Sequence, residues 1–453
     1  MLKIGVGAGC HACRLPLAID LARSGQVKYL AFDRQSERTT AVDHLERSRG
    51  GRAFDKELET YLEHLLPHTV SQGIKWVTNA GGEDPEGALQ VALKTCRELG
   101  FDHLRISALE QHDPLPRIKE LNPTVLETGE PLSNLDGEIL GATLYYGVQQ
   151  IVDGLRAGAD IVITNRVGDP TLYLGPMIHE FGWAMDDWDT LAAGQAVGQL
   201  LECGVQVTGG YFASPPYKTV PNLASVSNPI AEVDPDGSAV ITKLPEGGGA
   251  VTLPIVKEQM LYEVGNPSRY VHTDVIVDFT TARLEEVGPN RIRISGVTGH
   301  PRPQTLKALV IVNNGYVGEA YIMFGGSDCL DRARAEAELV RERLSVMGIE
   351  PLEFRAAYIG VNSLLSRWLA DPIVPREVML HVAARFRTYD EAYAFEWDCF
   401  KTGGCFGVAG GTAGRSMSRI DDMPAMYSVL VPASAFEEPK PVVVDVRPEV
   451  AVR

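Results

Sequence analysis

A short strand, a glycine-rich turn and a helix open the chain, and this order constrains its fold more than any other feature. The apolar run at residues 2–6 predicts a buried strand, and Gly7 and Gly9 follow in the turn. Apolar residues at helical spacing then predict a helix over residues 14–24. Backbone N–H groups at the start of such a helix, its dipole and Arg14 favour an anion. The sequence therefore predicts a pocket for a carboxylate or phosphate, unless the glycines serve only a tight turn.

Strands and helices alternate along the first third of the chain. Apolar runs at residues 27–32, 73–78, 104–107 and 158–164 predict further strands, with helical patterns between them. This alternation is typical of an α/β fold with a mainly parallel sheet and helices on both faces. Ligands of such sheets bind at the carboxyl ends of the strands. The predicted substrate-binding residues there are Gly7, Gly9, Arg14, Asn79, Gly81, Gly82, Asn165, Arg166, Gly209 and Gly210.

Short strands dominate the middle of the chain. We expect residues 215–325 to form a β-rich part, either a subdomain or an extension of the first sheet. Prolines at positions 372 and 375 suggest a linker. The predicted domains are therefore an α/β core over residues 1–375 and a small α/β domain over residues 376–453. The tail of the small domain is either loose or adds an edge strand.

Charge and cysteine content exclude several classes of protein. The net charge of −17 argues against a nucleic acid or an anionic membrane as partner. An anionic substrate would need a local basic pocket, which makes Arg14 and Arg166 informative. Seven scattered cysteines are not a disulfide framework. The chain begins directly with a strand, and no apolar run is long enough to cross a bilayer, so we expect a cytoplasmic protein. We also expect a small-molecule ligand and a homo-oligomer, because chains of this type often pair.

Ordered motifs along the chain match one family pattern. Examples are Tyr-Leu-Ala-Phe at residues 29–32, Glu-Arg-Thr at 37–39, Asn-Ala-Gly-Gly at 79–82, Asn-Arg-Val-Gly-Asp-Pro-Thr at 165–171, His-Glu-Phe-Gly-Trp at 179–183, Leu-Leu-Glu-Cys-Gly at 200–204 and Thr-Gly-Gly-Tyr-Phe at 208–212. These stretches resemble the acyclic terpene utilisation protein A family, and the likeness covers most of residues 1–375. The resemblance implies catabolism of a branched carboxylate or its CoA thioester, as in the degradation of citronellol-like terpenes, without identifying a reaction.

The chain departs from the family pattern at positions that matter for chemistry. Cys13 stands where the pattern has the aspartate before Arg14, and Cys10 and His11 crowd the same turn. Asn165 replaces a glycine, and Gln199 replaces a histidine. If the missing aspartate and histidine are catalytic in the family, this chain either runs different chemistry or uses a cysteine in an equivalent role.

The thiols of the first turn suggest a nucleophile or a base. Cys10 or Cys13, next to a helix N-terminus and Arg14, would have a lowered pKa and could take a proton or attack a carbonyl. The alternative is a buried structural pair. A single Cys/His cluster is too few ligands for a structural zinc, so we assign no metal. We also assign no resident cofactor.

Carboxylates offer general acid–base chemistry as a second route. Asp169, Glu180, Glu202 and Glu83 fall at predicted strand ends or helix termini. An ordinary role, as a helix cap or a solvated helix end, explains most of these carboxylates. Asp169 is the one that we consider a candidate catalytic residue, because it lies beside Arg166.

The predicted function is an enzyme acting on a branched carboxylate or acyl-CoA, by hydration or elimination (a lyase) or by hydrolysis. Cys13 or Cys10 would be the base or nucleophile and His11 or Asp169 its proton partner, while Arg14 and Arg166 would hold the acid group. One alternative is a dinucleotide-dependent oxidoreductase, because Gly7-x-Gly9-x-x-Ala12 matches a nucleotide-binding turn and Asp33 ends the second strand. The other alternative is a non-catalytic acyl-CoA-binding subunit.

Overall fold

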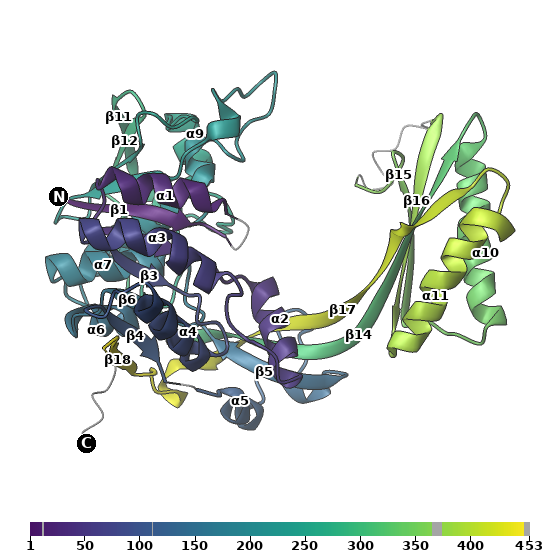
Figure 1. The fold of residues 1–453 in the computed structure, drawn as a ribbon, viewed down its shortest axis with the longest axis horizontal. Coiled ribbons are helices and arrows are strands. Elements are labelled where there is room, and N and C mark those ends of the chain that lie inside the picture. Colours follow the sequence, from purple (N-terminus) through teal and green to yellow (C-terminus); the bar gives the residue numbers. More distant parts are fainter. Residues whose placement is uncertain (11–12, 111, 365–373, 448–453) are drawn as a thin grey trace. The chain divides into compact units, whose positions relative to one another are not determined.

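The chain folds into two compact units. The structure is a computed structural model that describes residues 1–10, 13–110, 112–364 and 374–447, without the side chains of residues 404, 405, 415 and 416. Unit 1 consists of Met1–Leu135, Leu140–Ile311 and Met426–Arg453, and unit 2 of Asp136–Ile139 and Val312–Ala425. Residue 375, where the sequence analysis placed a boundary, falls inside unit 2. The two long strands β14 (Thr305–Gly325) and β17 (Thr412–Pro432) each pass from one unit to the other, and so does β5 (Glu138–Leu144) (Figure 1).

Parallel strands form the centre of the ten-stranded sheet in unit 1. Their residues are almost all buried, as expected for strands covered on both faces. Because the strands are parallel, their carboxyl ends lie along one edge of the sheet. In order across the sheet they are β1 (Leu2–Ala8), β2 (Tyr29–Phe32), β3 (Lys75–Thr78), β6 (Ile161–Ile163) and β4 (Arg105–Leu109).

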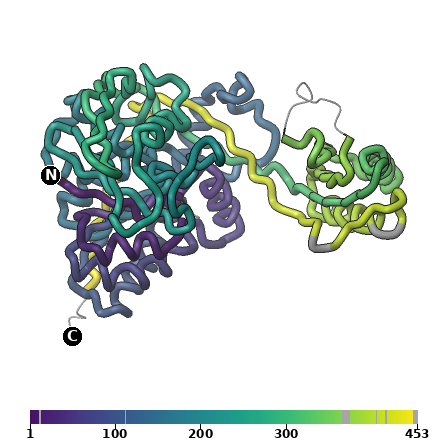
Figure 2. Tube along the Cα trace, turned by 90° about the horizontal axis from the view of Figure 1, so that it is seen from above, coloured from purple at the N-terminus to yellow at the C-terminus, as the bar shows by residue number. Residues whose placement is uncertain are grey.

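Antiparallel strands extend this sheet at both edges. On the β1 side they are β7 (Pro229–Val233), β8 (Ala239–Lys243), β12 (Arg291–Ser295) and β11 (Arg283–Gly288). Much of the predicted β-rich part is thus an extension of the first sheet. On the other side β18 (Pro441–Asp445) pairs with β4, so the tail does add an edge strand, and Figure 2 shows this yellow segment returning to the unit of the N-terminus. The α/β class is confirmed, with a sheet that is mixed rather than uniformly parallel.

Helices bury both faces of the central strands. One apolar core contains residues of α1 (Leu15–Ser24), α3 (Leu58–Gln72) and α4 (Pro85–Glu98), and the core on the opposite face contains residues of α6 (Gln149–Arg156), α7 (Thr171–Phe181) and α8 (Trp188–Leu201). The remaining elements of unit 1 include α2 (Glu37–Ser48), α5 (Leu115–Leu121), α9 (Leu253–Met260), β5 (Glu138–Leu144, shared with unit 2) and a small antiparallel sheet of β9 (Tyr270–Val271), β10 (Ile276–Asp278) and β13 (Thr298–His300).

Unit 2 is a two-layer α/β structure. Its sheet has the order β15 (Glu353–Ile359), β16 (Glu377–Phe386), β14 and β17. Alternate residues of β16 are buried, from Val378 to Phe386, and they share a core with α10 (Cys329–Val346) and α11 (Tyr389–Lys401). This period of two is what one buried sheet face requires.

The first glycine turn makes a close backbone contact that only glycine allows. A Cβ atom at Gly9 would lie 2.3 Å from the Gly204 backbone nitrogen. We therefore expect Gly9→Ala to lower the free energy of unfolding by about 1–3 kcal/mol, because the overpacked backbone must shift. Gly265→Ala is the matched control, since its Cβ would meet nothing within 4 Å. Equal urea-unfolding free energies for the two variants would contradict this contact.

Asp274 ties two helices of unit 1 together from a buried position. It accepts a hydrogen bond from the Val148 backbone N–H (2.8 Å) at the start of α6 and one from the Thr171 hydroxyl (3.2 Å) at the start of α7. Burial nevertheless raises the pKa of Asp274 to about 6. The folded protein therefore binds a proton that the unfolded chain releases near pH 4, and this part of its stability is lost as pH rises from 4 to 6.

Replacing Asp274 with asparagine removes this titration. We expect the stability of Asp274→Asn relative to wild type to rise by about 3 kcal/mol between pH 4 and 8, measured by urea unfolding. Asp236→Asn is the control, because hydrogen bonds from Ser238 lower the pKa of Asp236. The stability of this variant relative to wild type should therefore change with pH in the opposite direction. A pH-independent difference for Asp274→Asn would show that this carboxyl is ionised in the folded state.

Candidate functional site

A cavity of about 460 Å³ lies in unit 1 where the carboxyl end of β6 meets α7 and the small sheet. We call it the Arg166 cavity. It is lined by polar and ionisable side chains together with apolar ones, as binding sites for small molecules commonly are. The lining residues are Glu37, Tyr145, Arg166, Gly168, Asp169, Pro170, Glu202, Glu263, Tyr270, Val271, His272, Thr273, Pro303, Thr305, Lys307 and Leu430.

Arg166 is at the centre of the ionic contacts of this cavity. Its Nη1 donates to Asp169 Oδ1 (2.5 Å) and to the Gln35 carbonyl (2.6 Å), and it lies 3.9 Å from Asp33 Oδ1. Its Nη2 lies 3.6 Å from Glu37 Oε1. The guanidinium is 3% exposed, and its Nε has no hydrogen-bond partner among the described atoms. The Arg-x-x-Asp motif thus closes into one ion pair at the end of β6.

Lys307 is a second cation among the residues that line the cavity. Glu37 accepts hydrogen bonds from the Tyr145 hydroxyl (2.6 Å) and from Lys307 Nζ (3.3 Å). Burial alone would raise the pKa of Glu37, but Arg166, Tyr145 and Lys307 outweigh burial and lower it to about 2. Glu37 is therefore an anion at neutral pH. Lys307, with 41% of its side chain exposed, is the more accessible of the two cations.

Carboxyl groups with raised pKa values surround Arg166. Burial and the charge of Asp169 raise the pKa of Asp33 well above its ordinary value. Burial also raises the pKa of Asp169, although Arg166 opposes the shift. The pKa of Glu202 is raised well above its ordinary value by burial and by repulsion from Asp169 and Asp33. Closely packed carboxyls with one central cation retain protons that isolated carboxyls would release.

Polar groups of the small sheet and of residue 263 close the cavity. The Tyr270 hydroxyl donates to Gln199 Oε1 (3.1 Å), so the glutamine at the position of the family histidine orients a lining tyrosine. Burial lowers the pKa of His272 to about 4, which makes its imidazole neutral at pH 7. Glu263 has a φ of 61°, a left-handed conformation that is strained for this residue type.

The predicted asparagine and glycine positions after β3 and β6 lie outside the lining of this cavity. Asn79 donates to Asp33 Oδ1 (2.7 Å) and accepts from the Arg34 backbone N–H (2.6 Å), which fixes the turn after β2. Gly81 N–H donates to the Thr164 carbonyl (3.0 Å). Gly82 has a φ of 50°, and the Asn165 Oδ1 is buried without a described partner. These four residues do not line the cavity.

The predicted glycines of the first and last turns have packing roles. A Cβ at Gly7 would lie 2.1 Å from the Phe32 ring, and Gly9 meets the Gly204 backbone. Gly209, with a φ of 103°, and Gly210 lie against valine side chains. Protein atoms thus lie against Gly7 and Gly9, and Asp33 accepts a hydrogen bond from Asn79. The geometry does not support the dinucleotide alternative.

Cys10, Cys13 and Arg14 form a separate group. The two Sγ atoms lie 3.3 Å apart, and Arg14 Nη1 donates to the Ala224 carbonyl (3.1 Å). None of the three lines the Arg166 cavity. The expected lowering of the pKa is wrong for Cys13, because the hydrogen bond with Cys10 and burial raise it instead. His11, the other predicted catalytic residue of this turn, lies outside the described residues.

Of the predicted residues, the structure thus brings Asp169 and Arg166 together in one cavity. Sequence reasoning judged Glu202 an ordinary helix end and did not single out four other lining residues as functional. A signal did exist for Glu37, which belongs to a matched family motif, and for Lys307, a polar residue at an alternating position in an apolar strand. The four residues not singled out are Glu37, Tyr145, Tyr270 and Lys307.

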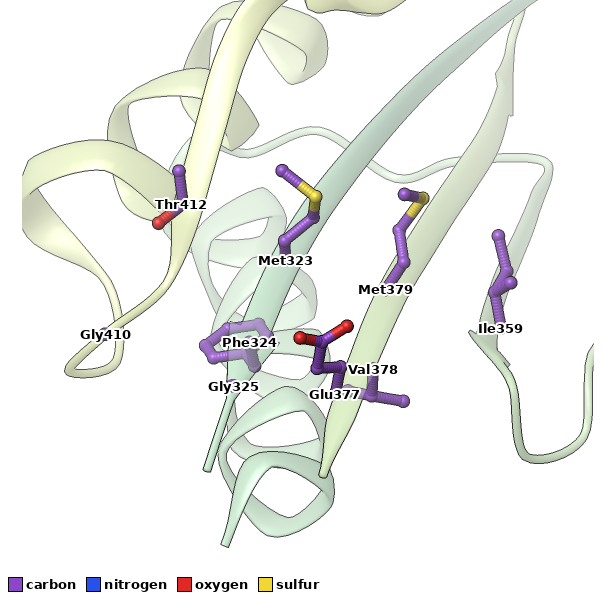
Figure 3. Close-up of a pocket in the computed structure, with 9 residues that line it drawn as sticks. All are labelled: Met323, Phe324, Gly325, Ile359, Glu377, Val378, Met379, Gly410 and Thr412. Carbon is purple, nitrogen blue, oxygen red and sulfur yellow. The ribbon is translucent and has the colours of Figure 1, made fainter. Parts of the chain in front are cut away.

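A second cavity, of about 450 Å³, lies in unit 2 and is mainly apolar (Figure 3). Met323 of β14 and Met379 of β16 line it, with Glu377 as its one carboxylate among the described lining residues. It lacks the cluster of buried acids that distinguishes the Arg166 cavity. We therefore take the Arg166 cavity as the candidate active site.

The described residues contain no group of three or more His, Cys, Asp and Glu side chains placed to hold a metal ion. No helix in the described ranges combines the length and the apolarity needed to span a membrane.

Comparison with known proteins gives one match. The model of the acyclic terpene utilisation family protein AtuA matches residues 2–440. No curated protein and no solved structure matches the chain. The family match includes the Arg166–Asp169 motif, Glu37 and Glu202, which meet in the cavity. Because the match covers nearly the whole chain, this protein belongs to the AtuA family, and its role is in acyclic terpene utilisation.

Proposed function

We propose that this protein is a lyase-type enzyme that adds water to, or eliminates water from, a branched acyl substrate, either a free carboxylate or its CoA thioester. The observation that carries the proposal is the cluster of carboxyls with raised pKa values around Arg166, open to a cavity of about 460 Å³. Cavities of about 300–1,000 Å³ bind small organic molecules, and the apolar lining suits a branched chain.

Addition and elimination of water need two proton transfers. One group takes a proton from the carbon next to the carbonyl, and another protonates the departing hydroxyl. Asp169 has 29% of its side chain exposed and holds the Arg166 ion pair, which favours its ionised form and suits it to be the base. Glu202, whose pKa is raised well above its ordinary value, suits the acid role. Lys307 is placed to attract the carboxylate or the thioester oxygen.

The composition of the lining favours this chemistry over covalent hydrolysis. Among the described residues that line the Arg166 cavity there is no serine and no cysteine. Acid–base groups are present among these lining residues, whereas a serine hydroxyl or a cysteine thiol is not. Cys10 and Cys13, the predicted nucleophiles, belong to the separate group after β1.

A panel of branched acyl compounds tests the proposal. Citronellol-derived branched acids, saturated and α,β-unsaturated, and their CoA thioesters are incubated with the full chain in D₂O and followed by mass spectrometry. We expect deuterium incorporation into the acyl chain and a gain or loss of one water. Release of free CoA without exchange would instead indicate hydrolysis. Binding of a thioester with neither change would indicate the acyl-CoA-binding subunit.

A further inference from the structure

The turn after β1 places two sulfur atoms almost within bonding distance. Cys10 Sγ and Cys13 Sγ lie 3.3 Å apart, and a disulfide bond needs about 2.05 Å. The turn is already closed, because the Cys13 backbone N–H donates to the Cys10 carbonyl (3.1 Å). The two sulfur atoms must therefore move only a short distance toward each other to form the bond.

The two sulfurs differ in access in the way that thiol–disulfide exchange requires. Cys10 is exposed, whereas Cys13 is half-buried and packs against the apolar core that includes α1. An external disulfide can reach the first sulfur but not easily the second. Cys13 lies directly before Arg14, the N-cap of α1.

Neighbouring groups anchor the half-buried thiol. The Gly9 backbone N–H donates to Cys13 Sγ (3.2 Å), and the Tyr61 hydroxyl donates to the Cys13 carbonyl (3.0 Å). The pKa of the Cys13 thiol is raised by its hydrogen bond with Cys10 and by burial, so Cys13 keeps its proton until Cys10 has reacted. Cys96, Cys329 and Cys399 are buried, and Cys203 is half-buried beside Glu202.

We propose that Cys10 and Cys13 form a redox-active dithiol that is reversibly oxidised to an intramolecular disulfide by exchange with a low-molecular-weight or protein disulfide. The Cys10 thiolate attacks one sulfur of the external disulfide, forms a mixed disulfide and releases one thiolate. Cys13 then loses its proton and attacks the Cys10 sulfur, and the second external thiolate leaves. Two electrons pass from the protein to the external disulfide, and the two protons end on the released thiols.

This exchange occurs next to the candidate active site without being part of it. Gly9, which hydrogen-bonds to Cys13 Sγ, is packed against the backbone of residues 202–204. When Cys13 turns to bond Cys10, the Gly9 N–H loses its sulfur acceptor. The oxidation state of the pair is thus linked to the segment that carries Glu202. The disulfide itself does not depend on the proposed function and is measured without any substrate.

One tryptic peptide makes the measurement direct. Cleavage after Lys3 and Arg14 releases residues 4–14, which contain Cys10, Cys13 and no other cysteine. The full chain is equilibrated in buffers of reduced and oxidised glutathione, quenched with acid, alkylated, digested and analysed by mass spectrometry. We expect this peptide to lose the mass of two hydrogen atoms as the buffer becomes oxidising, and to recover both thiols with dithiothreitol. The folded chain should form the disulfide at a lower ratio of oxidised to reduced glutathione than the urea-unfolded chain.

Single variants separate the two sulfurs. Cys13→Ser should trap Cys10 as a stable glutathione adduct, whereas Cys10→Ser should leave the half-buried Cys13 mostly unmodified. Cys203→Ala is the control and should keep the wild-type transition in residues 4–14. Two free thiols or two glutathione adducts in the oxidised wild-type peptide would overturn the proposal. The proposal would also be overturned if the folded and the unfolded chain formed the disulfide at the same ratio of oxidised to reduced glutathione.

Discussion

Asparagine in place of Asp169 should lower kcat on the acyl substrate by about 10²–10⁴-fold, which is the usual contribution of a general base. The change keeps the shape of the side chain and an oxygen that can accept from Arg166 Nη1, so the ionic contacts of Arg166 with Asp33 and Glu37 remain. KM should change much less than kcat, because Lys307 and the apolar lining are intact. The measurement is steady-state kinetics with the substrate identified from the panel.

Asp20→Asn serves as the control for Asp169→Asn. Asp20 is an exposed carboxylate of α1 that lies outside the cavity lining, so the variant should match wild type in kcat and KM. An Asp169→Asn enzyme with wild-type kcat would remove Asp169 from the reaction. A rise in KM with unchanged kcat would assign it to binding instead.

Methionine in place of Arg166 should lower the free energy of unfolding by about 3–5 kcal/mol at pH 8, because it leaves buried acids without their cation. Arg166 is the cation that contacts Asp169, Asp33 and Glu37. Its charge lowers the pKa of all three carboxyls. Removing it therefore favours their protonated forms in the folded state. Urea unfolding at several pH values measures the effect.

The loss in Arg166→Met should depend on pH with a definite sign. Glu37, whose folded pKa is lowered to about 2, contributes stability that is present above pH 4.5 and is lost as pH falls toward 2. Without Arg166 this contribution shrinks, so the stabilities of the variant and the wild type should converge as pH falls from about 4.5 toward 2. Arg38→Met, a change of an exposed arginine next to Glu37, is the control and should show a difference of under about 0.5 kcal/mol. A pH-independent loss would mean that Arg166 stabilises the fold through packing alone.

Local patterns were sufficient to predict the central architecture of unit 1. The apolar runs that became β1, β2, β3 and β6 are short, buried and separated by helical patterns, so the parallel order follows from them. The division of the chain was not predictable in the same way. The long strands β14 and β17 each belong to both units, and β14 continues without a break through Asn313-Asn314-Gly315, a sequence that is typical of a turn, beside the point where it passes from one unit to the other.

The candidate site could be predicted only where residues that are close together in the sequence form it. Arg166 and Asp169 are three positions apart at a strand end, so the sequence already places them side by side, although it did not predict their ion pair. Lys307 and Tyr270 reach the same cavity from β14 and β9, elements whose placement depends on the whole topology. Glu202 resembles a solvated helix end in the sequence, and only the packing of the first turn against residues 202–204 shows that it is buried.

We propose that Glu202, whose pKa is raised well above its ordinary value by burial and by neighbouring carboxyls, is the acid that delivers a proton to the substrate. Infrared difference spectroscopy tests this claim without a substrate, because protonated and ionised carboxyls absorb at different frequencies. We predict a C=O stretching band of a protonated carboxylic acid in the wild type at pH 7.5 that is absent in Glu202→Gln. A wild-type spectrum in which Glu202→Gln removes only carboxylate absorption would contradict the account.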